Sequence, residues 1–168
     1  MTELKSIDKL FICGDSFCSH DADYPGLSWS EKFAAKNAHI EIANLSLVGA
    51  SNYLIYLQVK YALDNNAKYI IYMPTSSIRQ EFLVNHDNSN HDHINRYDNI
   101  TSPTGKSMIS TSWVTPTAHW QFDSKKLNVI QNFFKEFVDI PNIVEKNYIF
   151  IIHTLQLLSD SGISWAWS

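Results

Sequence analysis

The sequence has few cysteines, no long apolar run and no large net charge. Its 168 residues include two cysteines, Cys13 and Cys18, and neither has a companion at the Cys-x-x-Cys spacing of metal-binding motifs. A disulfide between them would require the chain to double back within five residues. A chain of this length buries enough apolar surface to fold without a disulfide or a metal. The cysteines therefore predict no disulfide scaffold, and Cys13, inside an apolar run, is expected to be buried.

The other absences limit the classes of partner. No apolar stretch approaches the length of a membrane-spanning helix. A formal net charge of −4 gives no electrostatic basis for binding nucleic acid or an anionic membrane. The first ten residues, MTELKSIDKL, lack the apolar centre of a signal peptide. The expected location is therefore the cytoplasm.

The first half of the chain alternates between strand and helix patterns. Short apolar runs predict strands, and apolar residues at helical spacing predict the helices between them. Ser28 and Glu31 have the spacing of a capping box at the start of the first helix. Such alternation predicts one α/β domain, residues 1–168, with a mostly parallel sheet. The predicted order is strand 9–13, helix 29–38, strand 39–47, helix 53–66 and strand 68–73.

The second half begins with a polar segment rich in Asn, Asp and His. Residues 82–122 are too long for a plain connection and predict an insertion or a lid. A helix follows over 125–138, and a second one is expected from Pro141 to a C-terminal cap at Gly162. The last six residues, ISWAWS, are expected to form a final strand.

Ser16 is the first candidate for chemistry. It lies in LFICGDSFCSHD, residues 10–21, directly after the first predicted strand. An ordinary strand-to-loop turn is one interpretation, since Gly, Asp and Ser are common turn formers. The other is a nucleophile, because ligands bind at the carboxyl ends of parallel strands. Gly49 and one of residues 75–77 follow the next two strands, and they would supply hydrogen-bond donors beside such a nucleophile.

Two blocks of the sequence resemble those of the SGNH or GDSL hydrolase family, and a third segment stands at the position of its third block. FICGDSF resembles the first block, and IEIANLSLVGASN resembles the second, a strand followed by the oxyanion glycine. AKYIIYMPTSS stands where that family has its third block. The resemblance spans about residues 8–80, nearly half of the chain.

This resemblance implies a fold and a reaction. The implied fold is a flavodoxin-like three-layer α/β/α sandwich, and the implied reaction is hydrolysis of an ester or thioester without a cofactor. Ser16 would be the nucleophile, and the Ser16 and Gly49 N–H groups would bind the oxyanion. The partner would be a small acyl or ester substrate. The candidate catalytic residues are Ser16, Asp15 and His20, and the candidate oxyanion or substrate residues are Gly14, Gly49, Ser76 and Arg79.

The sequence departs from the family in two places. Pro-Thr-Ser-Ser at 74–77 replaces Gly-x-Asn-Asp, which puts Ser76 where the family has asparagine. No Asp-x-x-His block is present to supply the general base, as though the last elements of the fold were missing. His20 or His119 is then the candidate base, whereas His153 is expected to be partly buried within its helix. The alternative is a catalytically impaired member of the fold that serves as a binding or assembly module.

Two further patterns predict surface properties. The segment NHDNSNHDH, residues 85–93, contains metal-ligating side chains, but its spacing matches no standard site and favours a solvated loop. Arg79 could bind a substrate anion or form a structural ion pair. Trp165 and Trp167 lie on one face of the final strand. If that strand is exposed, it is expected to favour self-association into a homo-oligomer.

Overall fold

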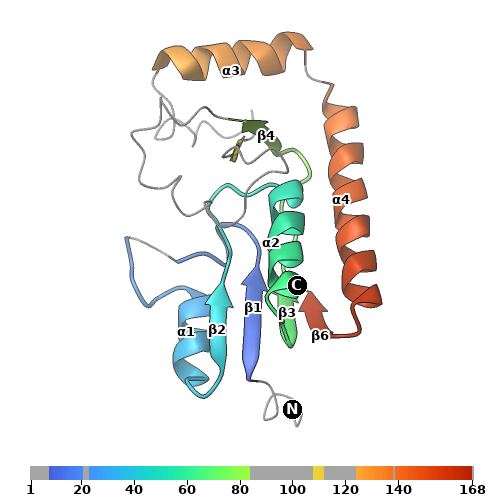
Figure 1. The fold of residues 1–168 in the computed structure, drawn as a ribbon. Coiled ribbons are helices and arrows are strands. Elements are labelled where there is room, and N and C mark those ends of the chain that lie inside the picture. Colours follow the sequence, from blue (N-terminus) through green and yellow to red (C-terminus); the bar gives the residue numbers. More distant parts are fainter. Residues whose placement is uncertain (1–7, 21–22, 84–107, 112–123, 138, 168) are drawn as a thin grey trace.

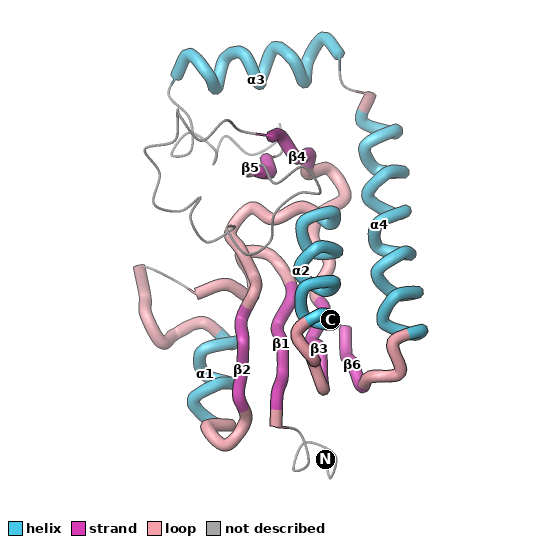
Figure 2. The backbone as a smooth tube through the Cα atoms, viewed as in Figure 1, coloured by secondary structure: helices cyan, strands magenta, loops and turns pink. Residues whose placement is uncertain are grey.

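A computed structural model describes residues 8–20, 23–83, 108–111, 124–137 and 139–167. The chain forms an α/β fold around a four-stranded, all-parallel sheet with strand order β2-β1-β3-β6 (Figure 1). A separate two-stranded antiparallel pair, β4-β5, lies beyond the carboxyl end of that sheet (Figure 2). The predicted alternation and the parallel sheet are therefore confirmed.

The elements of the first half follow the predicted order. They are β1 (Lys9–Cys13), α1 (Trp29–Lys36), β2 (Glu41–Asn44), α2 (Asn52–Asp64) and β3 (Tyr69–Tyr72). The predicted second strand, 39–47, was too long, because the regular pairing with β1 spans only Glu41–Asn44, although Leu45 and Leu47 still donate to the carbonyls of Ile12 and Gly14. Helix α1 ends two residues early, where the side chain of Asn37 donates to the Phe33 carbonyl at 2.8 Å.

The second half contains β4 (Gln80–Leu83), β5 (Met108–Thr111), α3 (Ser124–Phe137), α4 (Ile140–Asp160) and β6 (Ser164–Trp167). Pro141 occupies the first turn of α4, and Gly162 follows its end with φ of 69°, a conformation that favours glycine. The predicted insertion at 82–122 lies mostly outside the described residues. None of the helices in the described ranges is both long and apolar enough to cross a membrane.

Helices pack on both faces of the parallel sheet. Alternate residues of a strand point to opposite faces, so Phe11 and Cys13 lie on one side and Leu10 and Ile12 on the other. The first side packs against α2 and the end of α4, and the second against Phe33 of α1. Cys13 and Cys18 are buried free thiols, as expected for Cys13, and burial raises the pKa of Cys18 to about 11. The two central strands, β1 and β3, contain the buried residues of the sheet, and this packing fixes their ends.

β6 is an edge strand of the described sheet. Trp165 packs partly into the core, whereas the side chain of Trp167 is 58% exposed. Ile149 and Ile152 of α4 are also exposed. Unpaired edge strands with apolar side chains favour association, so the homo-oligomer through this strand stays a prediction.

Candidate functional site

The candidate site lies at the carboxyl edge of the parallel sheet. The strand order reverses between β1 and β3, since β2 lies on one side of β1 and β3 on the other (Figure 1). In open α/β sheets a crevice forms at such a reversal, outside the carboxyl ends of the two strands. Ser16 follows β1, and Ser76 follows β3. Their position is therefore the expected binding edge of this fold.

Gly14 connects β1 to the turn that carries Ser16. Its N–H donates to Gln58 Oε1 at 2.8 Å, and Gln58 Nε2 donates back to its carbonyl at 3.2 Å. A Cβ at this position would lie 2.6 Å from Cys18 Sγ, so any other residue would require the buried Cys18 side chain to shift. The Gly14 N–H is already bonded within the protein, and the contribution of Gly14 is to anchor the turn on α2.

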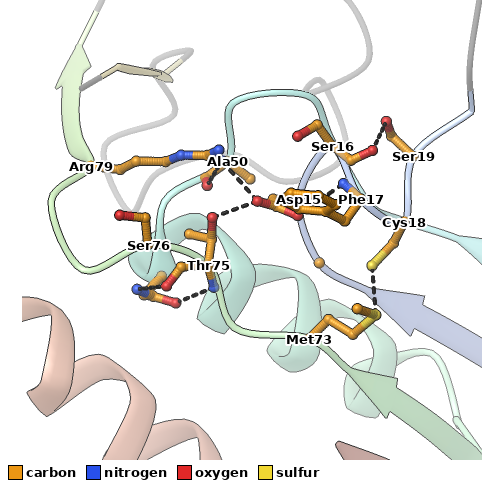
Figure 3. A network of polar contacts seen from close by, with 12 residues as sticks. Asp15, Ser16, Phe17, Cys18, Ser19, Ala50, Met73, Thr75, Ser76 and Arg79 are labelled. Atoms are coloured by element: carbon orange, nitrogen blue, oxygen red, sulfur yellow. Dashed lines mark hydrogen bonds and ion pairs between the residues drawn. The ribbon is translucent and has the colours of Figure 1, made fainter. Parts of the chain in front are cut away.

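Ser16 is exposed within that turn, and its backbone is held on both sides. The Asp15 carbonyl accepts from the N–H groups of Cys18 and Ser19, both at 3.1 Å. The Ser19 hydroxyl donates to the Ser16 carbonyl at 3.2 Å (Figure 3). Within the described ranges no acceptor contacts the Ser16 N–H and no partner contacts its hydroxyl. Among the described residues, Ser16 therefore presents a hydroxyl and an N–H without partners on a fixed backbone.

Asp15 is buried, and its carboxylate points toward the loop that follows β3 (Figure 3). Oδ2 accepts from Thr75 Oγ1 at 2.5 Å and pairs with Arg79 Nη1 at 3.1 Å. Oδ1 accepts from the Phe17 N–H at 3.0 Å. The same Arg79 nitrogen donates to the Ala50 carbonyl at 2.8 Å. The ion pair that the sequence left as one alternative for Arg79 therefore forms with Asp15.

The turn after β2 contains Gly49. The Ala50 N–H donates to the Leu47 carbonyl at 3.1 Å, and Gly49 has φ of 82°. A positive φ at the third residue matches a type II turn and favours glycine. No acceptor within the described part of the chain contacts the Gly49 N–H. As far as the described residues go, Gly49 thus adds a second N–H without an acceptor at the carboxyl edge of the sheet.

Ser76 is exposed, and its hydroxyl accepts from the Ile78 N–H at a long 3.5 Å. The neighbouring Thr75 also contacts Asp15, a pairing the sequence did not predict. In the sequence, polar residues within an otherwise apolar helix pattern were the signal that could have identified the side chains holding the carboxyl edge of the sheet. Gln58 and Asn52 are fully buried on α2, where they bond to Gly14 and Thr75.

His20 is paired with Glu31 rather than with Ser16. Its Nδ1 contacts Glu31 Oε1 at the first turn of α1. Glu31 also closes the predicted capping box, since Oε2 accepts from the Ser28 N–H at 3.1 Å and from its hydroxyl at 2.7 Å. The structure thus bonds the Asp15 carboxylate to Thr75 and Arg79 and the His20 side chain to Glu31, and within the described ranges neither side chain contacts the Ser16 hydroxyl.

The Glu31 contacts predict a pH dependence of stability. Hydrogen bonds from Ser28 first, then from Gly26 and His20, lower the pKa of Glu31 from 4.5 to about 2. A lowered pKa in the folded state stabilises the fold above the unfolded value, and that contribution is lost as the pH falls. We expect Glu31→Gln to be less stable than the wild type above pH 4.5, with the difference disappearing toward pH 2. Urea unfolding in pH steps measures this; a difference independent of pH would contradict it.

The other histidine predictions fall into two groups. His153 lies on α4 and is exposed, so the expectation that it is partly buried was wrong, because it faces away from the α2 contact. His119 and the histidines of residues 85–93 lie outside the described residues. Among the residues that the structure does describe, no group of three His, Cys, Asp or Glu side chains is placed to hold a metal ion.

The chain was compared with protein-family models, curated proteins and solved structures. No protein-family model matches the chain, and neither a curated protein nor a solved structure matches it.

Proposed function

We propose that this protein is a serine-dependent hydrolase of a small ester or acyl group, with Ser16 as the nucleophile. One observation carries the proposal: an exposed hydroxyl stands on a fixed turn directly after the central strand β1, at the reversal of strand order. The resemblance of the GDS block to SGNH hydrolases supports it. The strand order β2-β1-β3-β6 is also compatible with the flavodoxin-like sandwich of that family.

In this proposal two backbone N–H groups stabilise the oxyanion. Ser16 Oγ bonds to the carbonyl carbon of the substrate while a general base takes its proton. The negative charge that develops on the carbonyl oxygen is bound by the N–H groups of Ser16 and Gly49, which have no acceptor within the described ranges. The proton then passes to the leaving alcohol, and water releases the acyl group from Ser16. His119, outside the described residues, and His20, after release from Glu31, are the candidate bases.

A fluorophosphonate probe tests the proposal, because it reacts with activated serines. We expect mass spectrometry to locate the label on Ser16 and to find none on a Ser16→Ala variant. Ser159→Ala is the matched control, since Ser159 is exposed on α4 and should leave the labelling unchanged. A folded wild-type chain that stays unmodified under conditions that label a known serine hydrolase would overturn the proposal.

A binding or assembly module is the second candidate. The observation that favours it is the commitment of polar neighbours: the Asp15 carboxylate is bonded to Arg79 and Thr75, and His20 to Glu31. A serine without its base retains only the catalysis due to binding and oxyanion stabilisation. An unlabelled but folded wild-type chain in the same experiment supports this alternative.

A further inference from the structure

The side chain of Arg79 joins the three loops that follow β1, β2 and β3. Arg79 itself belongs to the loop after β3 and directly precedes β4. Its Nη1 atom lies 3.1 Å from Asp15 Oδ2, in the turn after β1, and 2.8 Å from the Ala50 carbonyl, in the turn after β2 (Figure 3). One nitrogen therefore holds both neighbouring turns at a fixed separation.

The loop that carries Arg79 is itself anchored on two helices. The Arg79 carbonyl accepts from Asn147 Nδ2 of α4 at 3.1 Å. Asn52 of α2 bonds to Thr75 in both directions, from Nδ2 to the carbonyl at 3.1 Å and from the N–H to Oδ1 at 2.9 Å. Asn52 Nδ2 also donates to Asn147 Oδ1 at 3.2 Å, and both amides are buried. Buried, mutually bonded amides are costly to displace, so the base of the Arg79 side chain is rigid.

Each contact of Arg79 is one residue away from a group in the proposed reaction. Asp15 precedes the nucleophile Ser16, and Ala50 follows Gly49, the second N–H donor. Oxyanion donors act only when they point at the position where the charge develops. Supporting contacts must hold such groups within about 0.5 Å of the productive geometry. The distance between the Ser16 and Gly49 N–H groups therefore depends on Arg79.

We propose that Arg79 is a positioning residue that sets the separation of the Ser16 and Gly49 turns through Asp15 and Ala50. As a statement about catalysis this rests on the proposed function; as a statement about the two turns it does not. Arginine suits the role because one planar nitrogen carries two N–H bonds in fixed directions, which fits two acceptors at once. A lysine keeps the charge without that fork, so it is expected to replace arginine only in part.

The first test compares Arg79→Met and Arg79→Lys with the wild type, and with Lys60→Met as the control for loss of an exposed cation. We expect the rate of fluorophosphonate labelling at Ser16 to fall about 100-fold in Arg79→Met, since misplacement by about 1 Å costs that much. Arg79→Lys should recover part of the rate, and Lys60→Met all of it. Full-rate labelling of folded Arg79→Met would overturn the proposal. If Arg79→Met does not fold, Arg79→Lys alone decides, and wild-type rates in that variant overturn it.

A second measurement separates positioning from direct binding of substrate. For matched neutral and anionic esters, positioning predicts an equal fall in kcat with little change in KM. A rise in KM confined to the anionic ester would instead make Arg79 a substrate-binding residue and overturn the proposal.

A third measurement does not depend on activity. Backbone hydrogen exchange of residues 14–19 and 46–52 is expected to accelerate in Arg79→Met while that of β6 stays unchanged. If wild-type Ser16 is not labelled, the proposed function fails and this measurement still decides: unchanged exchange of both turns overturns the positioning role, and faster exchange supports it.

Discussion

Replacing Asp15 with alanine is expected to lower the free energy of unfolding by about 3 kcal/mol, the low end for a buried pair, because it leaves the partly buried Arg79 cation without its carboxylate. The Asp15 side chain is 3% exposed and that of Arg79 is 18% exposed, so water replaces the lost partner poorly. The substitution also removes the acceptor for the Thr75 hydroxyl and the Phe17 N–H. The partly buried Thr75 hydroxyl loses a charge-assisted hydrogen bond, whereas the exposed Phe17 residue can bond to water instead.

Urea unfolding of the variant and the wild type measures this difference. Asp64→Ala is the matched control, since Asp64 is exposed at the end of α2 and its loss should change stability by less than about 0.5 kcal/mol. The double variant Asp15→Ala with Arg79→Met should lose less free energy of unfolding than the two single variants lose together, because neither charged group is left without its partner. Additive effects of the two substitutions would show that the carboxylate and the guanidinium do not interact.

The second large effect is on turnover. If Ser16 is the nucleophile, Ser16→Ala should lower kcat on a short-chain ester by about a thousandfold or more, since no acyl intermediate forms. Because the side chain is exposed and its hydroxyl has no partner within the described ranges, stability should change by less than about 0.5 kcal/mol. Loss of activity without loss of stability is the signature of a residue that acts in the reaction.

Release of a chromophore from a p-nitrophenyl ester, corrected for spontaneous hydrolysis, measures the rate. Ser159→Ala provides the comparison with an exposed serine far from the sheet edge on α4. Equal rates for the wild type and Ser16→Ala, both above the spontaneous rate, would exclude Ser16 as the nucleophile. Rates at the spontaneous level for both would favour the binding module.

The sequence by itself determined the elements of the parallel sheet and its helices in their order, although it did not predict the strands β4 and β5. β1 was predicted with its observed bounds, and the capping box at Ser28 and Glu31 was predicted from spacing alone. The predicted bounds of helix α3 and of the last strand differ from the observed bounds by one residue at each end. Periodicity, caps and turns are set by neighbours along the chain, so the sequence carries them directly. The predicted parallel order of the strands also placed Ser16, Gly49 and Ser76 at one edge, because the carboxyl ends of parallel strands lie on the same side of a sheet.

Only the tertiary structure decided which side chains meet at that edge. Asp15 pairs with Thr75 and Arg79, each about sixty residues further along the chain, and Asn52 pairs with Asn147. The partner of His20 also came from the structure, which turns that side chain toward α1. Such pairs depend on strand order and on how α2 and α4 dock, and no local pattern encodes either. The sequence thus determined where a reacting group would stand, and the fold decided which residues hold it there.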